Sequence, residues 1–211
     1  MNGFHLALVL FLAGFAVSAY AGEEDALSHA ATALRDGRAA EAAALYQDLA
    51  EGGDGPAQYN LALLYLTGRG VPQSHRDALF WAWRARLSGV DKAPALIARM
   101  AEVTTDDLRK ELADRLVAAL QPRIDAGEGR AMLELSAVYL EVLPEADLTK
   151  GLVWQALAAA LDVPGAAEAR DITGARLPAE DRLTAEAEAV KALSDLCAKG
   201  LQGQTICEVM F

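Results

Sequence analysis

The residues of this chain that could do covalent or metal chemistry are few. Its two cysteines, Cys197 and Cys207, stand close together near the C-terminal end. No histidine lies near them in the sequence, so they make a poor metal site, whereas a pair at this spacing in an oxidising compartment forms a disulfide. We therefore expect a bond between Cys197 and Cys207 that holds the tail at 200–203 against the last helix. We expect no metal and no cofactor.

Histidines and carboxylates form no recognisable catalytic group. Beyond the N-terminal segment only His29 and His75 remain, in separate predicted hairpins. The acidic pairs at 106–107 and 180–181 stand where helices are expected to begin, and negative charge stabilises a helix N-terminus. The sequence also lacks a glycine-framed serine, a His-Glu-x-x-His motif and a glycine-rich phosphate loop. We accordingly predict that the protein is not an enzyme.

Composition predicts an all-α protein. The chain of 211 residues is rich in Ala, Leu, Glu and Arg and poor in β-branched residues, a composition that favours helices. Its formal net charge of −11 would repel nucleic acid and anionic membrane surfaces. We therefore exclude both as partners.

The N-terminus has the pattern of a signal peptide. Residues 6–17 (LALVLFLAGFAV) are apolar, and this run is shorter than the roughly 20 residues that span a bilayer. Ala19-Tyr20-Ala21 supplies a small-x-small cleavage pattern before an acidic segment. We expect export with cleavage near Ala21. The alternative is an uncleaved membrane anchor, because no Lys or Arg precedes the apolar run.

A stretch at 57–89 predicts two helices joined by a glycine turn. Apolar residues recur at three- and four-residue spacing on both sides of the turn. This stretch resembles a Sel1-like repeat, a relative of the tetratricopeptide repeat. The matching residues are Ala57, Gln58, Leu61, Tyr65, Gly68, Gly70, Val71, Gln73, Ala78, Trp81, Ala85 and Gly89.

The second half of the chain repeats the first. Residues 131–193 match residues 57–120 at an offset of 74 and, beyond a one-residue loss in the turn, of 73. The glycine turn has no counterpart there, because residues 141–147 replace it. The matched pairs include Ala57 and Ala131, Tyr65 and Tyr139, Trp81 and Trp154, Ala85 and Ala158, Val90 and Val163, Arg109 and Arg182, Val117 and Val190, and Leu120 and Leu193.

The resemblance and the duplication together predict a right-handed α-solenoid of helical hairpins. It would consist of two duplicated Sel1-like units behind an N-terminal capping hairpin. The predicted segments are a signal peptide at 1–21, the cap at 22–55, a first unit with linker helices at 56–127, a degenerate second unit at 128–199 and a tail at 200–211.

Most of the aromatic residues are expected in the core, because Tyr65, Trp81, Tyr139 and Trp154 recur at matching positions. Trp83 stands two residues after Trp81, about 200° around the helix, so it is either an exposed contact for a partner or packed against the short helix that follows. The first helix of each hairpin lines the concave face of a solenoid. Further contact candidates on these helices are Tyr59, Leu63, Leu133 and Ala137.

The resemblance implies a protein that binds other proteins. Sel1-like proteins act as adaptors, scaffolds or chaperones, and bacterial ones often work in the cell envelope. We expect a periplasmic adaptor for an envelope protein of basic character, which the acidic charge would attract. A dedicated chaperone of a secretion, motility or surface-polymer machine is an alternative. A β-lactamase-like hydrolase is a more distant one, since such Sel1-like proteins carry about a pair of cysteines per repeat.

Overall fold

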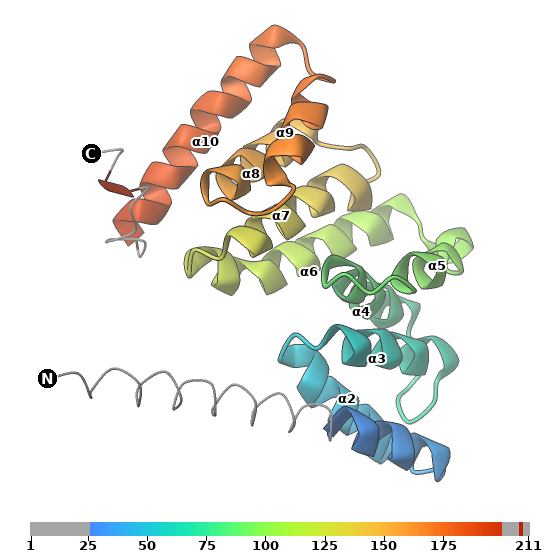
Figure 1. The fold of residues 1–211 in the computed structure, drawn as a ribbon. Coiled ribbons are helices and arrows are strands. Elements are labelled where there is room, and N and C mark those ends of the chain that lie inside the picture. The colour runs from blue at the N-terminus through green and yellow to red at the C-terminus, as the bar shows by residue number, and fades with distance from the viewer. Residues whose placement is uncertain (1–25, 200–206, 209–211) are drawn as a thin grey trace, which may run out of the picture. The chain divides into compact units, whose positions relative to one another are not determined.

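The computed structural model describes residues 26–199 and 207–208, and within these ranges every regular element is a helix (Figure 1). The predicted all-α class and its helical hairpins are confirmed. The contacts divide the chain into two compact units, 1–103 and 104–211. Each unit is described by itself below.

The first unit is a row of helices in which each packs against the next. A helical stretch at 26–35 comes first, then α2 against α3, α3 against α4 and α4 against α5 (Figure 1). The bounds are α2 Ala39–Glu51, α3 Gly55–Thr67, α4 His75–Leu87, α5 Ala93–Ala98 and a 3₁₀ turn, η1, Ala101–Val103.

The turn between α3 and α4 depends on its two glycines. Gly68 ends α3 in the left-handed conformation, with φ of 66°. Gly70 has φ of 76°, and a Cβ atom there would lie 2.1 Å from the backbone oxygen of Ala39. Only glycine satisfies both conditions, so this residue brings the turn against the start of α2. Ser74 then caps α4, because its side chain accepts a hydrogen bond from the backbone N–H of Asp77.

A buried glutamine links three helices of this unit. The side chain of Gln58 on α3 is 1% exposed. Its Nε2 donates to the backbone oxygen of Ala50 on α2 at 3.1 Å, and its Oε1 accepts from the hydroxyl of Ser88 at the end of α4 at 2.9 Å. Both polar ends of the amide are therefore satisfied inside the core.

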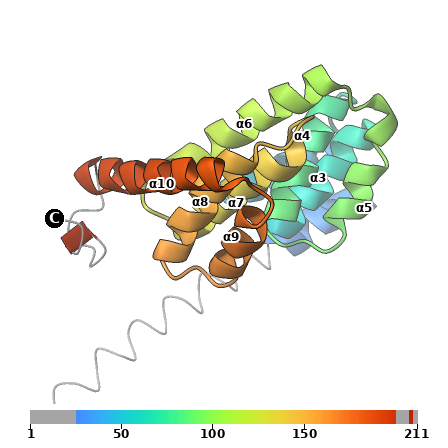
Figure 2. The same ribbon diagram turned by 90° about the horizontal axis from the view of Figure 1, so that it is seen from above.

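The second unit contains the longer helices. Helix α6 packs against α7 and η2, α7 against α8, and α8 against α9 and α10; Figure 2 shows the long α10 beside this group. The bounds are α6 Asp106–Asp125, α7 Gly129–Ala137, a π-helix η2 Val138–Val142, α8 Leu148–Ala160, α9 Ala166–Gly174 and α10 Ala179–Lys199.

The duplicated hairpins share a close contact that requires glycine. A Cβ atom at Gly55 would lie 2.9 Å from the side chain of Val90, and one at the matching Gly129 would lie 2.6 Å from that of Val163. The start of the first helix in each hairpin thus touches the loop that follows the second. Two positions from separate copies make the same contact, which supports the duplication seen in the sequence.

The copies differ at the turn inside the hairpin. Where the first has Gly68 and Gly70, the second continues α7 into the π-helix η2. Arg109 of α6 donates to the last carbonyls of this helix, from Nε to Val142 at 2.9 Å and from Nη2 to Glu141 at 3.1 Å. An arginine therefore satisfies carbonyl groups at the end of the π-helix. Because α6 packs on this hairpin, the compact division falls before α6, whereas the predicted repeat boundary lies at 127/128.

The predicted disulfide is confirmed. Cys197 and Cys207 are bonded, with their Cα atoms 5.6 Å apart. A disulfide of this kind belongs to proteins of oxidising compartments. No helix in the described ranges is both long and apolar enough for a membrane span. The predicted signal peptide and most of the tail lie outside the described residues.

Candidate functional site

The repeat-signature residues lie in or beside the core. Trp81 is 5% exposed, and Ala57, Leu61, Ala78 and Ala85 are fully buried. Tyr65, Tyr139 and Trp154 were expected in the core, but they are only half-buried. Gly68, Gly70 and Gly89 lie at the surface, and Ala158 is fully buried.

Trp83 is not exposed. Its side chain is 7% accessible, and the guanidinium of Arg86 lies 5.0 Å from its ring centre. The interpretation as an exposed contact assumed that α4 buries one face only. Helix α4 instead buries residues on several faces, which are Ala78, Leu79, Trp81, Ala82, Trp83, Ala85 and Leu87. An offset of two residues from Trp81 therefore does not bring a side chain to solvent.

The other predicted contacts are partly accessible. Tyr59 and Leu63 on α3, and Leu133 and Ala137 on α7, are all half-buried. The two pairs belong to different compact units. They remain candidate contacts, each on its own helix.

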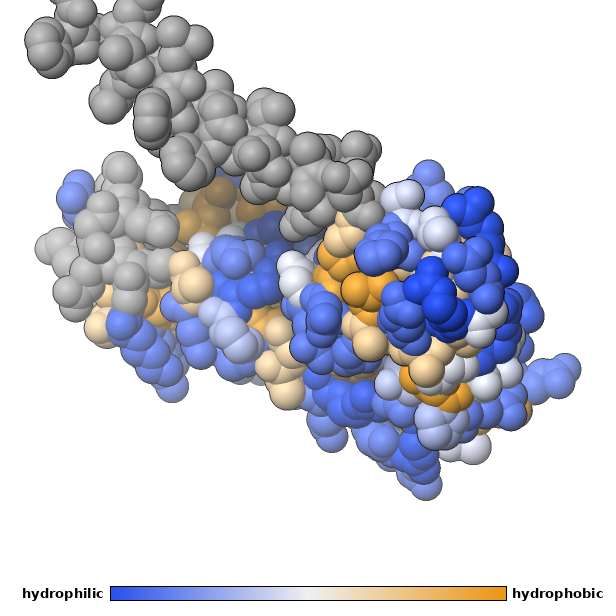
Figure 3. Space-filling model, turned by 90° about the horizontal axis from the view of Figure 1, so that it is seen from below, coloured by the Kyte–Doolittle hydropathy of each residue, from blue (hydrophilic) through white to orange (hydrophobic). Residues whose placement is uncertain are grey.

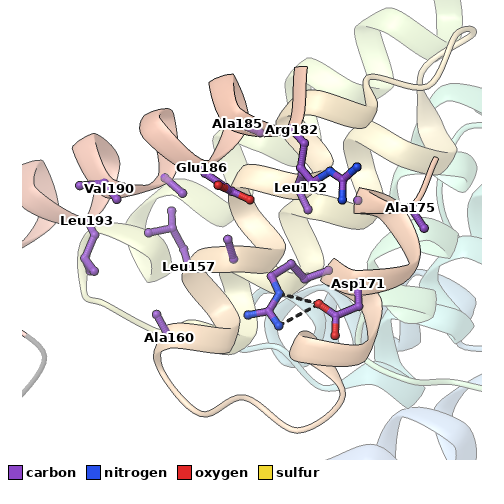
Figure 4. Close-up of a pocket in the computed structure, with 14 residues that line it drawn as sticks. Leu152, Leu157, Ala160, Asp171, Ala175, Arg182, Ala185, Glu186, Val190 and Leu193 are labelled. Atoms are coloured by element: carbon purple, nitrogen blue, oxygen red, sulfur yellow. Dashed lines mark hydrogen bonds and ion pairs between the residues drawn. The ribbon is translucent and has the colours of Figure 1, made fainter. Parts of the chain in front are cut away.

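The structure adds a groove that sequence reasoning missed. It lies in the second unit between α8, α9 and α10 and has a volume of about 680 Å³ (Figure 4). Its lining is mainly apolar. Residues of α8 and α10 that line it include Leu152, Ala156, Ala160, Ala189, Val190 and Leu193.

The groove opens where the second copy has smaller residues than the first. On α4 the positions in question are Leu79, Trp83 and Leu87, all less than 9% exposed. On α8, at the offset of 73, the matching residues are Leu152, Ala156 and Ala160. Ala156 is half-buried and Ala160 is exposed, and both line the groove. The replacement of tryptophan and leucine by alanine was the sequence signal that could have located it.

Four charged residues surround the apolar lining. Arg170 and Asp171 of α9 form an ion pair, with Nη2 and Oδ1 2.8 Å apart, drawn as dashed lines in Figure 4. Arg182 and Glu186 of α10 also line the groove. Neither makes an ion pair with any residue that the structure describes. The groove therefore presents one cation and one anion to a ligand.

The buried carboxylate of the second unit has a structural role. The side chain of Glu134 on α7 is 10% exposed and accepts from Nη1 of Arg123 at 2.6 Å, with Arg130 at 3.4 Å. Burial works against the charge of Arg123, but the hydrogen bonds and charges of Glu134 and Glu128 outweigh it, so the pKa of Arg123 is raised. The charges of Arg123 and Glu134 are thus paired across α6 and α7.

The described part of the chain contains no cluster of three or more His, Cys, Asp or Glu side chains placed to hold a metal ion. It does contain one polar atom that is buried without a hydrogen-bond partner, the Oε1 of Gln155 on α8. Gln155 is 4% exposed and does not line the groove.

Comparison with known proteins finds similarity among solved structures. No family model and no curated protein matches the chain. Among solved structures, the chain is similar to a protective antigen present in uropathogenic Escherichia coli strains that displays an SLR fold. The identity is 20% and the TM-score 0.34, over 75% of this chain and 41% of the antigen. The chain thus spans about two fifths of the antigen's length.

Proposed function

We propose that this chain is a non-catalytic adaptor of the bacterial cell envelope that binds another protein. The observation that carries the proposal is the groove between α8, α9 and α10, which is lined mainly by apolar residues and has a volume of about 680 Å³. Apolar depressions with a charged rim are where proteins accept the anchor residues of their partners. The repeat resemblance supports the same function, since stacked hairpins provide extended binding surfaces.

The net charge of the chain and its disulfide indicate the kind of partner and the compartment. The net charge of −11 favours a partner with basic character. In the view of Figure 3 most of the accessible surface is hydrophilic, with separate apolar patches. The Cys197–Cys207 disulfide fits an oxidising compartment such as the periplasm, to which the signal-like segment at 1–21 would direct the chain.

Crosslinking in the cell tests the proposal. A C-terminally tagged chain is crosslinked in living cells, and the adducts are purified under denaturing conditions and identified by mass spectrometry. We expect one envelope protein in a fixed ratio to the chain. Recovery of scattered abundant proteins only would refute the adaptor function. A partner recovered only during its own assembly would make the chain a dedicated chaperone, and turnover of nitrocefin by the purified chain would make it a hydrolase.

A further inference from the structure

We propose that the groove of the second unit is the docking site for an amphipathic helix of the partner protein. This helix places a bulky apolar side chain over Ala156 and its C-terminal end against Arg182. The inference rests on the proposed function and specifies its binding surface. The two copies of the repeat differ at the groove, and the first copy shows which side chains can occupy the matching positions.

The second copy has a smaller side chain than the first at position 156. In the first copy an indole, that of Trp83, occupies the position of Ala156 and is 7% exposed. In the second copy alanine leaves this space open, and the groove lies over it. Alanine at 156 and at 160 therefore creates a site with room for a large apolar side chain. Aromatic side chains are the most frequent anchors at protein interfaces.

Helices α6 and α10 are matched at the offset of 73 and differ in exposure. Position 117 of α6 is a half-buried valine, whereas the matching Val190 of α10 is 58% exposed and lines the groove. Ala113 is 3% exposed, while its match, Glu186, is exposed. Positions 113 and 117 of α6 are thus less exposed than the matching positions 186 and 190 of α10.

The segment of the second unit that packs against α6 indicates which kind of segment suits the matching positions of α10. Helix α7 and its extension η2 pack against α6, and Arg109 donates to the carbonyls of Glu141 and Val142 at the end of η2. Arg182 of α10 is the match of Arg109 and makes no ion pair among the described residues. The occupant that suits Arg182 is therefore the C-terminal end of a helix, whose last carbonyls need donors.

Charge complementarity at Glu186 favours a partner helix with a basic residue. Glu186 replaces the small Ala113 and brings a carboxylate to the lining, with no ion pair in the described ranges. Asp171 is already paired with Arg170. A lysine or arginine on the partner helix would complete the pair at Glu186, in agreement with the acidic charge of the whole chain. The stated occupant is thus a helix with a bulky apolar residue, a basic residue and an accessible C-terminal end.

Titration with a helix of the template type tests this site. The probe is a fluorescently labelled synthetic peptide of residues 129–142, which forms α7 and η2, added to the chain lacking residues 1–21. Fluorescence anisotropy is expected to show saturable binding. Arg182→Gln and Val190→Glu, both surface changes that leave the core intact, should each weaken it by about tenfold or more. Ala156→Trp should weaken it as well, because an indole would then fill the groove.

Leu183→Glu is the matched control. Leu183 is 65% exposed on α10 and does not line the groove, so this variant should change the affinity by less than about twofold. Absence of saturable binding, or an equal loss in Leu183→Glu and Val190→Glu, would overturn the docking site. Self-association of the chain that Val190→Glu abolishes would also overturn it, because the occupant would be a second copy. If crosslinking in cells still recovers one envelope protein with Val190→Glu in full yield, the adaptor function stands and the site lies elsewhere.

Discussion

Two glutamines are buried in the described part of the chain, and they make opposite contributions to stability. Exchanging each for methionine measures this. Gln58 has a partner at both ends of its amide, at 3.1 and 2.9 Å. Gln155 has a buried Oε1 with no partner among the described residues. Methionine has nearly the same length and shape as glutamine, and Met132 occupies the position that matches Gln58, with 0% exposure. The substitution therefore changes polarity with little change of packing.

The magnitudes follow from the hydrogen bonds. Gln58→Met removes two bonds at about 1 kcal/mol net each, so it should lower the free energy of unfolding by about 2 kcal/mol. Gln155→Met removes an unsatisfied carbonyl whose desolvation costs about 1 to 3 kcal/mol, so it should raise the free energy of unfolding by about 1 kcal/mol or more. For a chain of this size 1 kcal/mol corresponds to about 2 to 4 °C in Tm.

Urea unfolding followed by circular dichroism at 222 nm is the assay, on the chain lacking residues 1–21. The slope of free energy against urea should stay constant, since neither variant changes the surface exposed on unfolding. The reasoning fails if Gln155→Met is less stable than the parent, or if the two variants shift the midpoint in the same direction.

Three further predictions concern the backbone, the disulfide and pH. Gly70→Ala should lower the free energy of unfolding in urea by about 3 kcal/mol or more, because the new Cβ would overlap the backbone oxygen of Ala39. The control is Gly37→Ala, whose Cβ would have no atom within 4 Å. It should lower the free energy of unfolding by only about 1 kcal/mol, because of its positive φ. Reduction of the Cys197–Cys207 bond should lower the free energy of unfolding by about 2 to 3 kcal/mol, which is measured as a drop in Tm on addition of dithiothreitol. A variant with serine at both positions should not show this drop. Burial raises the pKa of Tyr46, so the folded state holds its proton longer than the unfolded one. The free energy of unfolding should therefore fall as the pH rises above about 10. Measured over an alkaline pH series, this fall should be smaller in Tyr46→Phe.

The sequence predicted the parts of the fold that depend on special backbone or covalent geometry. A glycine at 70 was expected in the turn, and the structure shows why no other residue fits there. The match of Val90 to Val163 corresponds to equal contacts with Gly55 and Gly129. The disulfide was predictable because two cysteines allow one pairing. In each case a single residue type or pairing satisfies the geometry.

Features that depend on the sum of many contacts were not predicted. Helix α4 is buried on several faces, so the spacing of apolar residues around Trp81 did not predict that Trp83 is buried. The π-helix η2 replaces the glycine turn without a local motif, and Arg109 from a distant part of the sequence binds its end. Ala156 and Ala160 look like ordinary helix residues. Their meaning appears only when the side chains that the first copy has at these positions are known.

The groove lies where the side chains of the two copies of the hairpin differ. Duplication gives matching positions on α4 and α8, and beside the groove the side chains differ at two of them, where Trp83 matches Ala156 and Leu87 matches Ala160. The first copy places Trp83 there and buries it, while the second places Ala156 there and leaves an apolar groove. Leaving apolar surface uncovered lowers the stability of the folded chain by about 25 cal/mol for each Å² not buried. That cost is offset when a partner covers the surface, which is why we assign binding to the second copy and a structural role to the matching residues of the first.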